Sequence, residues 1–265
     1  MSELDIFCVT NKHVNFLEKT KYKIGWVGKD RPKNDYFLCD TKINIFDKEK
    51  FYSELTFHYW YWKNILNLNQ KKWIGFCQKR RFWINPESEN QEINKFNITD
   101  HLLIKPHESW AEYDSIICKP INISGAKKIK IFKRGLRSLV RDPSILFNKN
   151  KESIKFHFDM HHGHGNLDKA INLLDEIDKD EFKEFVSKQN SFNPHIMMIS
   201  KPEILDQWFN SVFNWLKKCE NVFKPESLVG YDTTRLYAYL AERYLSFWFR
   251  KHTKYLESPW IFIDN

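Results

Sequence analysis

The fold of this chain is decided by residues 51–83, FYSELTFHYWYWKNILNLNQKKWIGFCQKRRFW. In the first half of the stretch, apolar side chains recur at the spacing of one helical face, which predicts an amphipathic helix. Glu54 lies in its first turns, where a negative charge suits the helix dipole. The expected buried stripe consists of Phe51, Leu55, Tyr59, Trp62 and Leu66, with His58 and Ile65 on its flank.

The second half of the stretch predicts a short buried strand at residues 73–77, followed directly by Gln78, Lys79, Arg80 and Arg81. In an open α/β sheet, ligands bind beyond the carboxyl ends of the strands. Two adjacent arginines at such an end are placed to hold an anion, and the planar guanidinium group suits phosphate. The alternative is that the arginines are solvated or ion-paired and that the helical stripe is simply core.

Several short motifs in this stretch resemble those of one bacterial family. They are similar in order and spacing to motifs of the capsular polysaccharide synthesis glycosyltransferases, which carry a domain of unknown function. Gln78 and Lys79 stand where that family has His-Tyr. The resemblance implies donor-binding roles for Glu54, Arg80 and Arg81. The matching motifs are Glu54-Leu55-Thr56, Tyr59-Trp60-Tyr61-Trp62-Lys63-Asn64, Ile74-Gly75-Phe76 and Arg80-Arg81-Phe82.

The same resemblance extends to blocks between residues 5 and 245. Thr10 and Lys12 match a motif that ends the family's first strand, and the resemblance implies that they lie near the nucleotide. Asp40 and Asn44 match part of a second motif, which implies contacts to ribose or sugar hydroxyls. The alternative for Thr10 and Lys12 is an ordinary strand-to-loop turn, and for Asp40 and Asn44 a capping or turn role.

Four histidines, His157, His161, His162 and His164, fall within eight residues. Neutral imidazole is a common transition-metal ligand, so a metal site is one interpretation. No second ligand cluster accompanies them, and glycines at 163 and 165 indicate a flexible loop. Because Asn166-Leu167-Asp168 also resembles the helix start that follows a histidine in that family, we favour a substrate-facing loop before a helix. On that interpretation His161 or His162 polarises an acceptor hydroxyl or neutralises phosphate, and Asp159 is the nearest carboxylate.

Residues 235–243, RLYAYLAER, resemble the closing motif of the family. The resemblance implies a catalytic role for Glu242 and a donor-binding role for Arg243, on a helix that reaches back into the cleft. The alternative is a structural ion pair. The Asp-x-Asp triplet at residues 178–180 has no strand before it, so we interpret it as solvated rather than metal-binding.

Composition sets broader limits. Hydrophobic residues make up 42% of the 265 residues and the net charge is +8, so the chain has enough apolar surface for a core and permits anionic partners. Five scattered cysteines argue against a disulfide framework or a zinc site and for a reducing compartment. The N-terminus is unlike a signal peptide, and no apolar run approaches the ~18–20 residues of a membrane span.

Residues 127–141, KKIKIFKRGLRSLVR, contain seven basic residues and a set of apolar side chains that fit one helical face. A basic amphipathic segment can lie on an anionic membrane surface, which suits a lipid-linked acceptor. It can equally bind nucleic acid, or be a solvated charged face.

The predicted fold is α/β, a GT-A-like single domain with a central mixed, mostly parallel sheet flanked by helices. We place the nucleotide-sugar half at about residues 1–125 and the acceptor half at about 126–265. Residues 84–113 are predicted to be irregular, and the tail at 255–265 to pack or pair with a sheet edge. Further strands are expected at 4–10, 22–27, 114–118 and 195–200, and helices at 167–177, 180–189, 202–219 and around 235–243.

The function implied by the resemblance is transfer of a hexose, galactosyl in some relatives, from a nucleotide sugar (UDP-sugar favoured) to a growing capsular polysaccharide or lipopolysaccharide. No cofactor is expected to be obligatory, although a divalent metal, Mn²⁺ or Mg²⁺, is compatible with the chemistry. The expected location is the cytoplasm, with peripheral contact of residues 127–141 on the inner membrane and no role for nucleic acid. The alternatives are a non-catalytic basic module that binds nucleic acid or an anionic membrane, and an inactive transferase-like protein.

Overall fold

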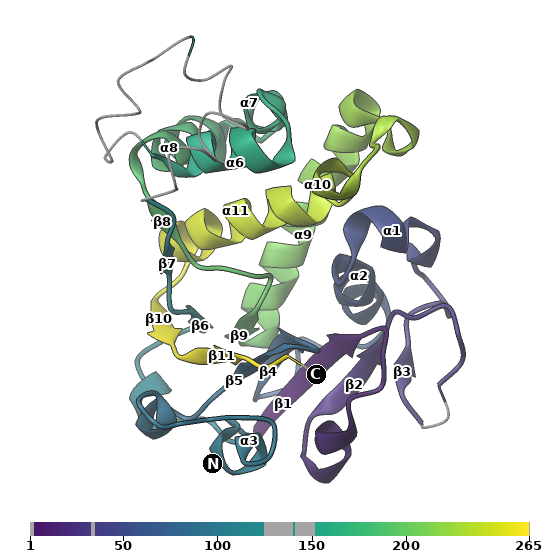
Figure 1. The fold of residues 1–265 in the computed structure, drawn as a ribbon, viewed down its shortest axis with the longest axis vertical. Helices are drawn as coiled ribbons and strands as arrows, with labels where there is room; N and C mark the ends of the chain where they lie inside the picture. Colours follow the sequence, from purple (N-terminus) through teal and green to yellow (C-terminus); the bar gives the residue numbers. More distant parts are fainter. Residues whose placement is uncertain (1–2, 33–34, 125–139, 141–151, 265) are drawn as a thin grey trace. The chain divides into compact units, whose positions relative to one another are not determined.

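The computed structural model describes residues 3–32, 35–124, 140 and 152–264 (Figure 1). The chain forms two compact units. Unit 1 comprises residues 1–119, 195–210 and 248–265, and unit 2 comprises residues 120–194 and 211–247. The basic segment at 127–141 lies outside the described residues except for Val140, so the expectation of a membrane-binding helix there stays a prediction.

Unit 1 is built on one mixed β-sheet, and its described strands follow the order β10-β6-β9-β4-β1-β2-β3, with β5 on β4 and β11 on β5. Pairing is parallel for β1 with β2 and β4, for β2 with β3 and for β6 with β10, and these ladders hold most of the paired residues. The predicted mixed, mostly parallel sheet is therefore confirmed. The strands are β1 Glu3–Thr10, β2 Lys23–Trp26, β3 Phe37–Leu38, β4 Lys72–Gln78, β5 Arg81–Trp83, β6 Ser115–Cys118, β9 Met198–Ser200, β10 Tyr255–Ser258 and β11 Trp260–Phe262.

The central strands β1 and β4 are buried on both faces. Successive side chains of a strand point to opposite faces, so Phe7 and Phe76 share one face while Cys8 and Cys77 face the other. Gly75 lets the strands pack closely, because a Cβ there would stand 2.8 Å from the side chain of Ile199 on β9. The strand predicted at residues 73–77 is thus confirmed as the middle of the sheet.

The helix expected across residues 51–66 is broken in two. α1 covers Glu49–Tyr52 and α2 covers Leu55–Asn64, and between them Ser53 adopts a positive φ of 53°. The buried face also differs from the predicted stripe. Tyr59 and Trp62 are only half-buried, and Phe57 of α2 packs instead on Phe7 of the sheet. The fully buried residues of α2 are Leu55, Thr56, Phe57, His58, Trp60 and Tyr61.

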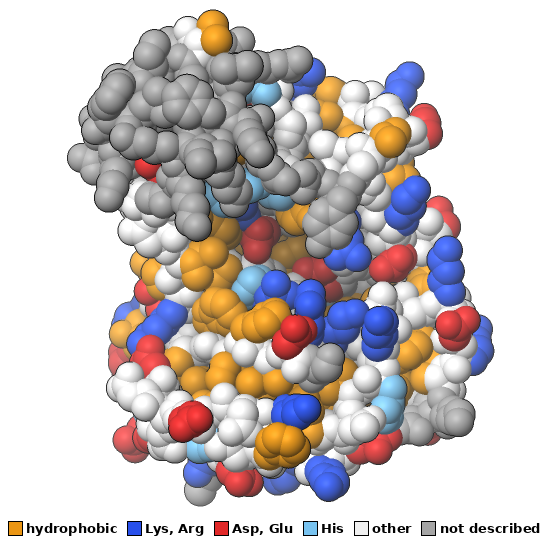
Figure 2. Space-filling model, viewed as in Figure 1, with side chains coloured by type: hydrophobic (Ala, Val, Ile, Leu, Met, Phe, Trp, Pro, Cys, Tyr) orange, Lys and Arg blue, Asp and Glu red, His pale blue; other side chains and the backbone are white. Residues whose placement is uncertain are grey.

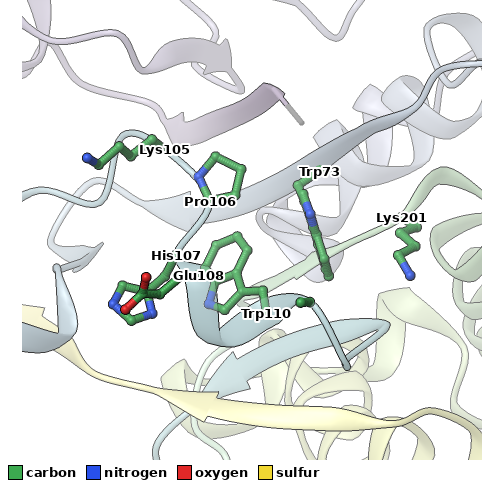
Figure 3. A pocket seen from close by; sticks show the side chains of 8 residues that line it. Trp73, Lys105, Pro106, His107, Glu108, Trp110 and Lys201 are labelled. Carbon is green, nitrogen blue, oxygen red and sulfur yellow. The ribbon is translucent and has the colours of Figure 1, made fainter. Parts of the chain in front are cut away.

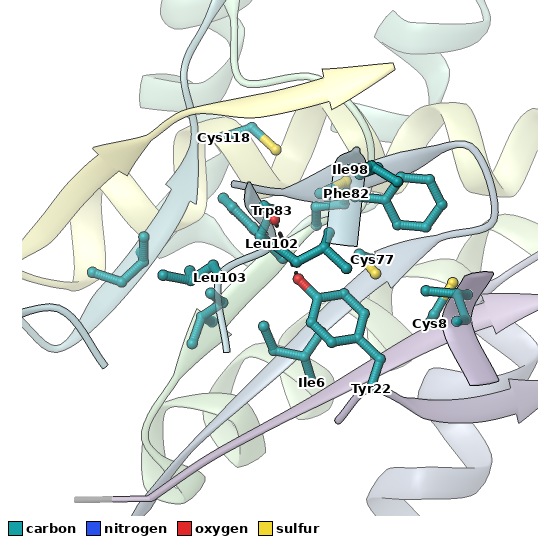
Figure 4. Packing of buried hydrophobic residues seen from close by; sticks show 14 of the residues in the cluster. Ile6, Cys8, Tyr22, Cys77, Phe82, Trp83, Ile98, Leu102, Leu103 and Cys118 are labelled. Atoms are coloured by element: carbon teal, nitrogen blue, oxygen red, sulfur yellow. Dashed lines mark hydrogen bonds between the residues drawn. The ribbon is translucent and has the colours of Figure 1, made fainter. Parts of the chain in front are cut away.

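The opposite face of the sheet is covered by connecting segments rather than by long helices (Figure 4). Tyr22 donates its hydroxyl to the carbonyl of Trp83 at 3.2 Å, and the indole of Trp83 donates to the carbonyl of Phe76 at 3.0 Å. Residues 84–113 are irregular, as predicted, apart from helical elements of three or four residues. The short helical elements of unit 1 are η1 Asn15–Lys19, η2 Phe46–Lys48, η3 Pro86–Ser88, α3 Ile98–His101 and η4 Glu108–Trp110.

Unit 2 is mainly helical, and α6, α7 and α8 lie side by side in it (Figure 1). The helices expected at 167–177 and 180–189 are found with a different boundary, at α7 and α8. Residues 178–180 lie inside α8, and the prediction that they are solvated is wrong for Asp178, which is 3% exposed and accepts a hydrogen bond from the Tyr244 hydroxyl at 2.6 Å. The described elements are β7 Ile121–Asn122, α6 Ile154–His162, α7 Asn166–Ile171, α8 Glu176–Lys188, β8 Ser191–Phe192, η7 Pro225–Ser227 and α10 Tyr231–Thr234.

Two long helices contribute residues to both units. α9 covers Pro202–Phe223 and α11 covers Leu236–His252, which confirms the helices predicted at 202–219 and around 235–243 and extends both. The tail was predicted to pack or pair with a sheet edge, and it forms β10 and β11, which pair with β6 and β5. All five cysteines are buried free thiols. No helix among the described residues is long and apolar enough to span a bilayer.

Candidate functional site

The carboxyl ends of β1 and β4 meet in unit 1. These parallel strands are paired up to Val9 and Gln78, and the backbone N–H of Lys79 donates to the carbonyl of Val9 at 3.2 Å. Lys12 is exposed just beyond β1, and Lys79 donates to the side chain of Asn11 at 2.6 Å. We call the residues gathered here the strand-end cluster, and they are Asn11, Lys12, Glu54, Gln78, Lys79, Arg80 and Arg81.

A tight hairpin positions the two arginines of this cluster. Gln78 pairs with Arg81 across the turn, so only Lys79 and Arg80 connect β4 to β5. The sequence placed both arginines in a segment beyond the strand, but Arg81 is the first residue of an antiparallel strand. The hairpin gives the two guanidinium groups different surroundings, because Arg80 projects from the turn and Arg81 from the sheet.

Both guanidinium groups lie near one aromatic ring. The central carbons of Arg80 and Arg81 are each 5.5 Å from the ring centre of Phe262, on β11. Arg81 donates to the Gln78 side chain at 3.2 Å, and Gln78 in turn donates to Glu54 at the start of α2. The structure therefore brings Glu54, Arg80 and Arg81 together in one connected group.

Arg80 is the more accessible of the pair. Its side chain is 44% exposed and forms an ion pair at 3.5 Å with Asp264, which is 77% exposed. An ion pair between exposed side chains is weak, so an incoming anion can replace the carboxylate at small cost. In Figure 2, Lys and Arg side chains gather near the middle of the view, close to the arrowhead of β1 in Figure 1.

Two other residues predicted to bind the nucleotide sugar, Thr10 and Asn44, form hydrogen bonds within their own loops. The hydroxyl of buried Thr10 hydrogen-bonds to the backbone of Lys12, and Asn44 accepts from the backbone N–H of Phe46 at 3.0 Å. These are the turn-forming roles that the sequence left as alternatives. Donor binding by Thr10 and Asn44 stays a prediction, and their side chains are engaged in the described structure.

Asp40 lies outside the strand-end cluster, after β3. Its carboxylate is held by Arg31 through a forked contact, with nitrogen to oxygen distances of 2.9 and 3.2 Å. Such a bidentate pair fixes the plane of the carboxylate. Asp40 is therefore oriented by Arg31, and a contact from it to ribose stays a prediction.

The two histidines predicted to be catalytic, His161 and His162, lie in unit 2. Ser153 caps the start of α6 by accepting the Phe156 N–H at 3.2 Å, and the helix continues through His161 and His162. The prediction that these two histidines lie in a loop is therefore wrong, since they form the last turn of a helix. The ring of His162 stacks on Tyr239 of α11, with ring centres 3.7 Å apart.

The loop that follows α6 is closed by Asp159. Its carboxylate accepts the backbone N–H of Gly165 at 2.9 Å and lies 3.4 Å from His164 and 3.6 Å from Lys155. Gly163 and Gly165 both have positive φ, at 97° and 79°, which turns the chain into α7. The Asp159 oxygens thus already have three polar neighbours, and the residue is nearly buried.

Arg243 lies on α11 and is 2% exposed. It forms an ion pair with the neighbouring Glu242, lies 3.8 Å above the ring centre of Phe192, and approaches His157 at 3.4 Å. Burial lowers the pKa of Arg243 from its usual value, and the negative charge of Glu242 opposes that shift. The structural ion pair left open by the sequence is what the described structure contains.

The described part of the chain contains no cluster of metal-ligating side chains. There, no group of three or more His, Cys, Asp or Glu side chains is placed to hold a metal ion. Asp178 and Asp180 are two residues apart on one helix and therefore do not face each other. Use of a divalent metal, Mn²⁺ or Mg²⁺, stays a prediction.

One cavity was missed by sequence analysis. It has a volume of about 530 Å³, and two tryptophans, Trp73 and Trp110, contribute to its wall (Figure 3). No sequence signal could have found it, because its residues come from the start of β4, the loop before β6 and the residue after β9. The remaining lining residues are Lys105, Pro106, His107, Glu108, Ala111 and Lys201.

Comparison with known proteins identifies the family of this chain and a solved structure of similar fold. The sequence matches the family described as DUF4422, a domain of unknown function, over residues 5–253. The chain belongs to this family. No curated protein matches it. This DUF4422 chain is similar in fold to a solved structure described as the WbbM bifunctional glycosyltransferase in its apo form, with a TM-score of 0.72 and 17% sequence identity. The similarity covers the whole of this chain and 46% of that protein, so the chain spans about half of its length.

Proposed function

We propose that this protein is a glycosyltransferase that moves a hexose from a nucleotide-sugar donor, UDP-linked by preference, to a growing capsular polysaccharide or lipopolysaccharide. The observation that carries the proposal is the strand-end cluster, where an accessible arginine stands at the carboxyl ends of two parallel strands. That is the edge of an α/β sheet at which ligands bind. The fold shared with a protein described as a bifunctional glycosyltransferase supports the same conclusion.

In this proposal the two arginines stabilise the leaving group. When the bond between the sugar and the diphosphate breaks, negative charge grows on the diphosphate, and fixed guanidinium donors lower the energy of that state. Arg80 exchanges Asp264 for a phosphate oxygen, while Arg81 is held in place by Gln78. Galactose, which some members of the resembling family transfer, is the first donor sugar to test.

The acceptor hydroxyl has to lose its proton as it attacks the sugar. Among the predicted catalytic residues, His161 is half-buried in the last turn of α6, with its ring centre 4.6 Å from that of His157. Imidazole titrates near neutral pH and can accept a proton there. We therefore infer that His161 is the general base, with His162 held against Tyr239 as its neighbour.

Titration with UDP and UDP-galactose tests the donor site. We expect both to bind the intact protein and to raise its melting temperature through linkage. Arg80→Ala and Arg81→Ala should each weaken UDP binding by about tenfold or more, in line with the ~1.5–3 kcal/mol of a hydrogen bond to a charged group. Arg250→Ala is the matched control, because Arg250 also forms a partly exposed ion pair, to Glu257 at 3.0 Å.

Two results would reject the proposal. One is UDP affinity in Arg80→Ala and Arg81→Ala equal to that of the unchanged protein. The other is stabilisation by oligonucleotides or anionic vesicles with no response to sugar nucleotides, which would favour the non-catalytic binding module. Hydrolysis or transfer of UDP-galactose, compared with and without a chelator, would then decide between an active enzyme and an inactive relative.

A further inference from the structure

We propose that the cavity lined by Trp73 and Trp110 binds an acidic sugar unit of an oligosaccharide, at a place separate from the strand-end cluster. This inference rests on the proposed function for the identity of the glycan, but its physical basis lies in unit 1 alone. The volume of about 530 Å³ falls within the ~300–1,000 Å³ typical of ligand pockets, enough for a disaccharide-sized ligand.

The cavity lies at the opposite end of β4 from the arginines. Trp73 is near the amino end of this strand, paired with Leu4, and Gln78 is its last residue. Five steps along a strand at ~3.3 Å each separate them by about 16 Å. A nucleotide sugar held at Arg80 therefore does not occupy this cavity, which leaves it for a different ligand.

Two indole rings give the cavity an apolar wall. The rings of Trp73 and Trp110 meet edge to face, with centres 5.1 Å apart at an angle of 64°. Both side chains are nearly buried, so the wall is rigid. Because Trp73 is 6% and Trp110 2% exposed, only a small part of each ring borders the cavity, and the C–H groups of a sugar would contact that apolar part.

Basic side chains that line the cavity favour a negatively charged ligand. Lys105 is exposed on one side of the cavity and forms no ion pair within the described part of the chain. On the other side, Lys201 lies 5.6 Å from the ring centre of Trp73 and is held by Asp114 at 3.1 Å. In Figure 3 the two lysines are drawn on either side of the tryptophans. A carboxylate on the sugar would be attracted by Lys105 directly, and by Lys201 in exchange for Asp114.

Polar groups suited to hydroxyls complete the lining. The indole N–H of Trp110 is buried and has no acceptor among the residues that the structure describes. A buried donor of this kind is normally satisfied by water or a ligand oxygen. Glu108 offers an acceptor, whereas His107 is already committed to Glu87 at 2.9 Å and to the Ser109 hydroxyl at 2.8 Å. One acceptor and one donor beside two cations match a hydroxylated acid better than a polyphosphate.

Calorimetry on the intact chain tests this assignment, with trigalacturonate as the acidic probe and maltotriose as the neutral probe of equal length. We expect trigalacturonate to bind at least about tenfold more tightly than maltotriose, because only the acid meets the lysines. Lys105→Gln should weaken trigalacturonate by about three- to tenfold and reduce the dependence of its affinity on salt. Trp110→Phe, which keeps a ring but removes the N–H, should weaken both sugars.

The controls separate this pocket from the donor site. Lys217→Gln removes an exposed lysine of α9 that does not line the cavity, and it should leave both sugar affinities unchanged. Arg80→Ala should weaken UDP but not trigalacturonate. Equal affinity for the two sugars, no binding of either, or an unchanged affinity in Lys105→Gln would overturn the pocket assignment. Failure of UDP to bind, with trigalacturonate still bound, would instead overturn the donor site, so the two failures are distinct.

Discussion

Arg80 and Arg243 carry the same guanidinium group in opposite surroundings. Arg80 projects from a hairpin turn in unit 1, 44% exposed, and its partner Asp264 is more exposed still. Arg243 is 2% exposed in unit 2, beside Glu242 and against the ring of Phe192. Both positions match the family resemblance, yet only Arg80 can change partners without leaving a buried charge behind. A match to a family motif therefore does not by itself imply donor binding, and the burial of each arginine separates a replaceable ion pair from a structural one.

The largest effect should come from the buried member of this comparison. Arg243→Met removes the charge that balances Glu242, and we expect the free energy of unfolding to fall by about 3–5 kcal/mol, as for other broken buried ion pairs. Urea unfolding measures this change. Arg250→Met, which breaks a more exposed ion pair with Glu257, is the matched control and should cost about 1 kcal/mol or less.

Unchanged stability of Arg243→Met would contradict the structural role that its burial indicates. If the variant unfolds at the same urea concentration as the unchanged protein but binds UDP much more weakly, then Arg243 contacts the donor. The burial of Arg243 would in that case belong to a binding site, as the sequence resemblance implied.

The next largest effect concerns Asp178, another buried charged residue of unit 2. Tyr244 donates to this carboxylate at 2.6 Å and also meets the Ser211 hydroxyl at 2.8 Å. Burial raises the pKa of Tyr244, and the nearby Asp178 adds to the shift. The hydroxyl therefore stays protonated and continues to donate its hydrogen bond to Asp178. Tyr244→Phe should lower the free energy of unfolding by about 2–3 kcal/mol, because Asp178 loses a partner inside the protein.

Ser211→Ala is the matched control for this prediction. It removes the second partner of the Tyr244 hydroxyl but leaves the contact to Asp178, so thermal or urea unfolding should show a loss of about 1 kcal/mol or less. Equal losses in the two variants would mean that Asp178 is as well solvated as the sequence first indicated.

The sequence predicted the sheet better than it predicted the helices and the site. Apolar runs such as the one containing Ile74 and Phe76 identified strands, because a strand buried on both faces needs little more than continuous hydrophobicity. The break at Ser53 was missed, since a positive φ is typical of glycine and no glycine marks this position. Asp178 was misjudged for a similar reason, because its partner Tyr244 lies 66 residues further along the chain.

The candidate site shows the same limit. Local motifs located Arg80 and Arg81, and the structure connects them through Gln78 to Glu54. The tryptophan cavity brings together three separate segments, so spacing along the chain carries no trace of it. Contacts between distant residues are set by tertiary packing, and a single sequence does not record them.

His58 sharpens the comparison by providing a buried group that must stay neutral. Its ring packs 4.5 Å from Phe76, and burial lowers its pKa to about 3. In the unfolded chain the pKa is about 6.5, so below that pH only the unfolded state takes up the proton and stability falls as pH falls. At pH 5 this loss should reach about 2 kcal/mol relative to pH 7.5.

His58→Phe isolates that contribution. The variant and the unchanged protein are compared by urea unfolding at pH 7.5 and pH 5, and the variant should lose about 2 kcal/mol less between the two conditions. The measurement at pH 7.5 corrects for the change in packing, since His58 is neutral there in both states. Parallel losses in the two proteins would show that His58 is protonated in the folded state.

The smallest effect on stability should come from Arg80, the exposed member of the comparison. Arg80→Ala breaks the ion pair with Asp264, and we expect the free energy of unfolding to change by less than about 1 kcal/mol, because water already solvates both charges. Urea unfolding in low and high salt checks this, and salt should shrink the difference further. A loss as large as that of Arg243→Met would mean that Arg80 holds the hairpin together, and the accessible cation on which the donor site depends would then be a structural one.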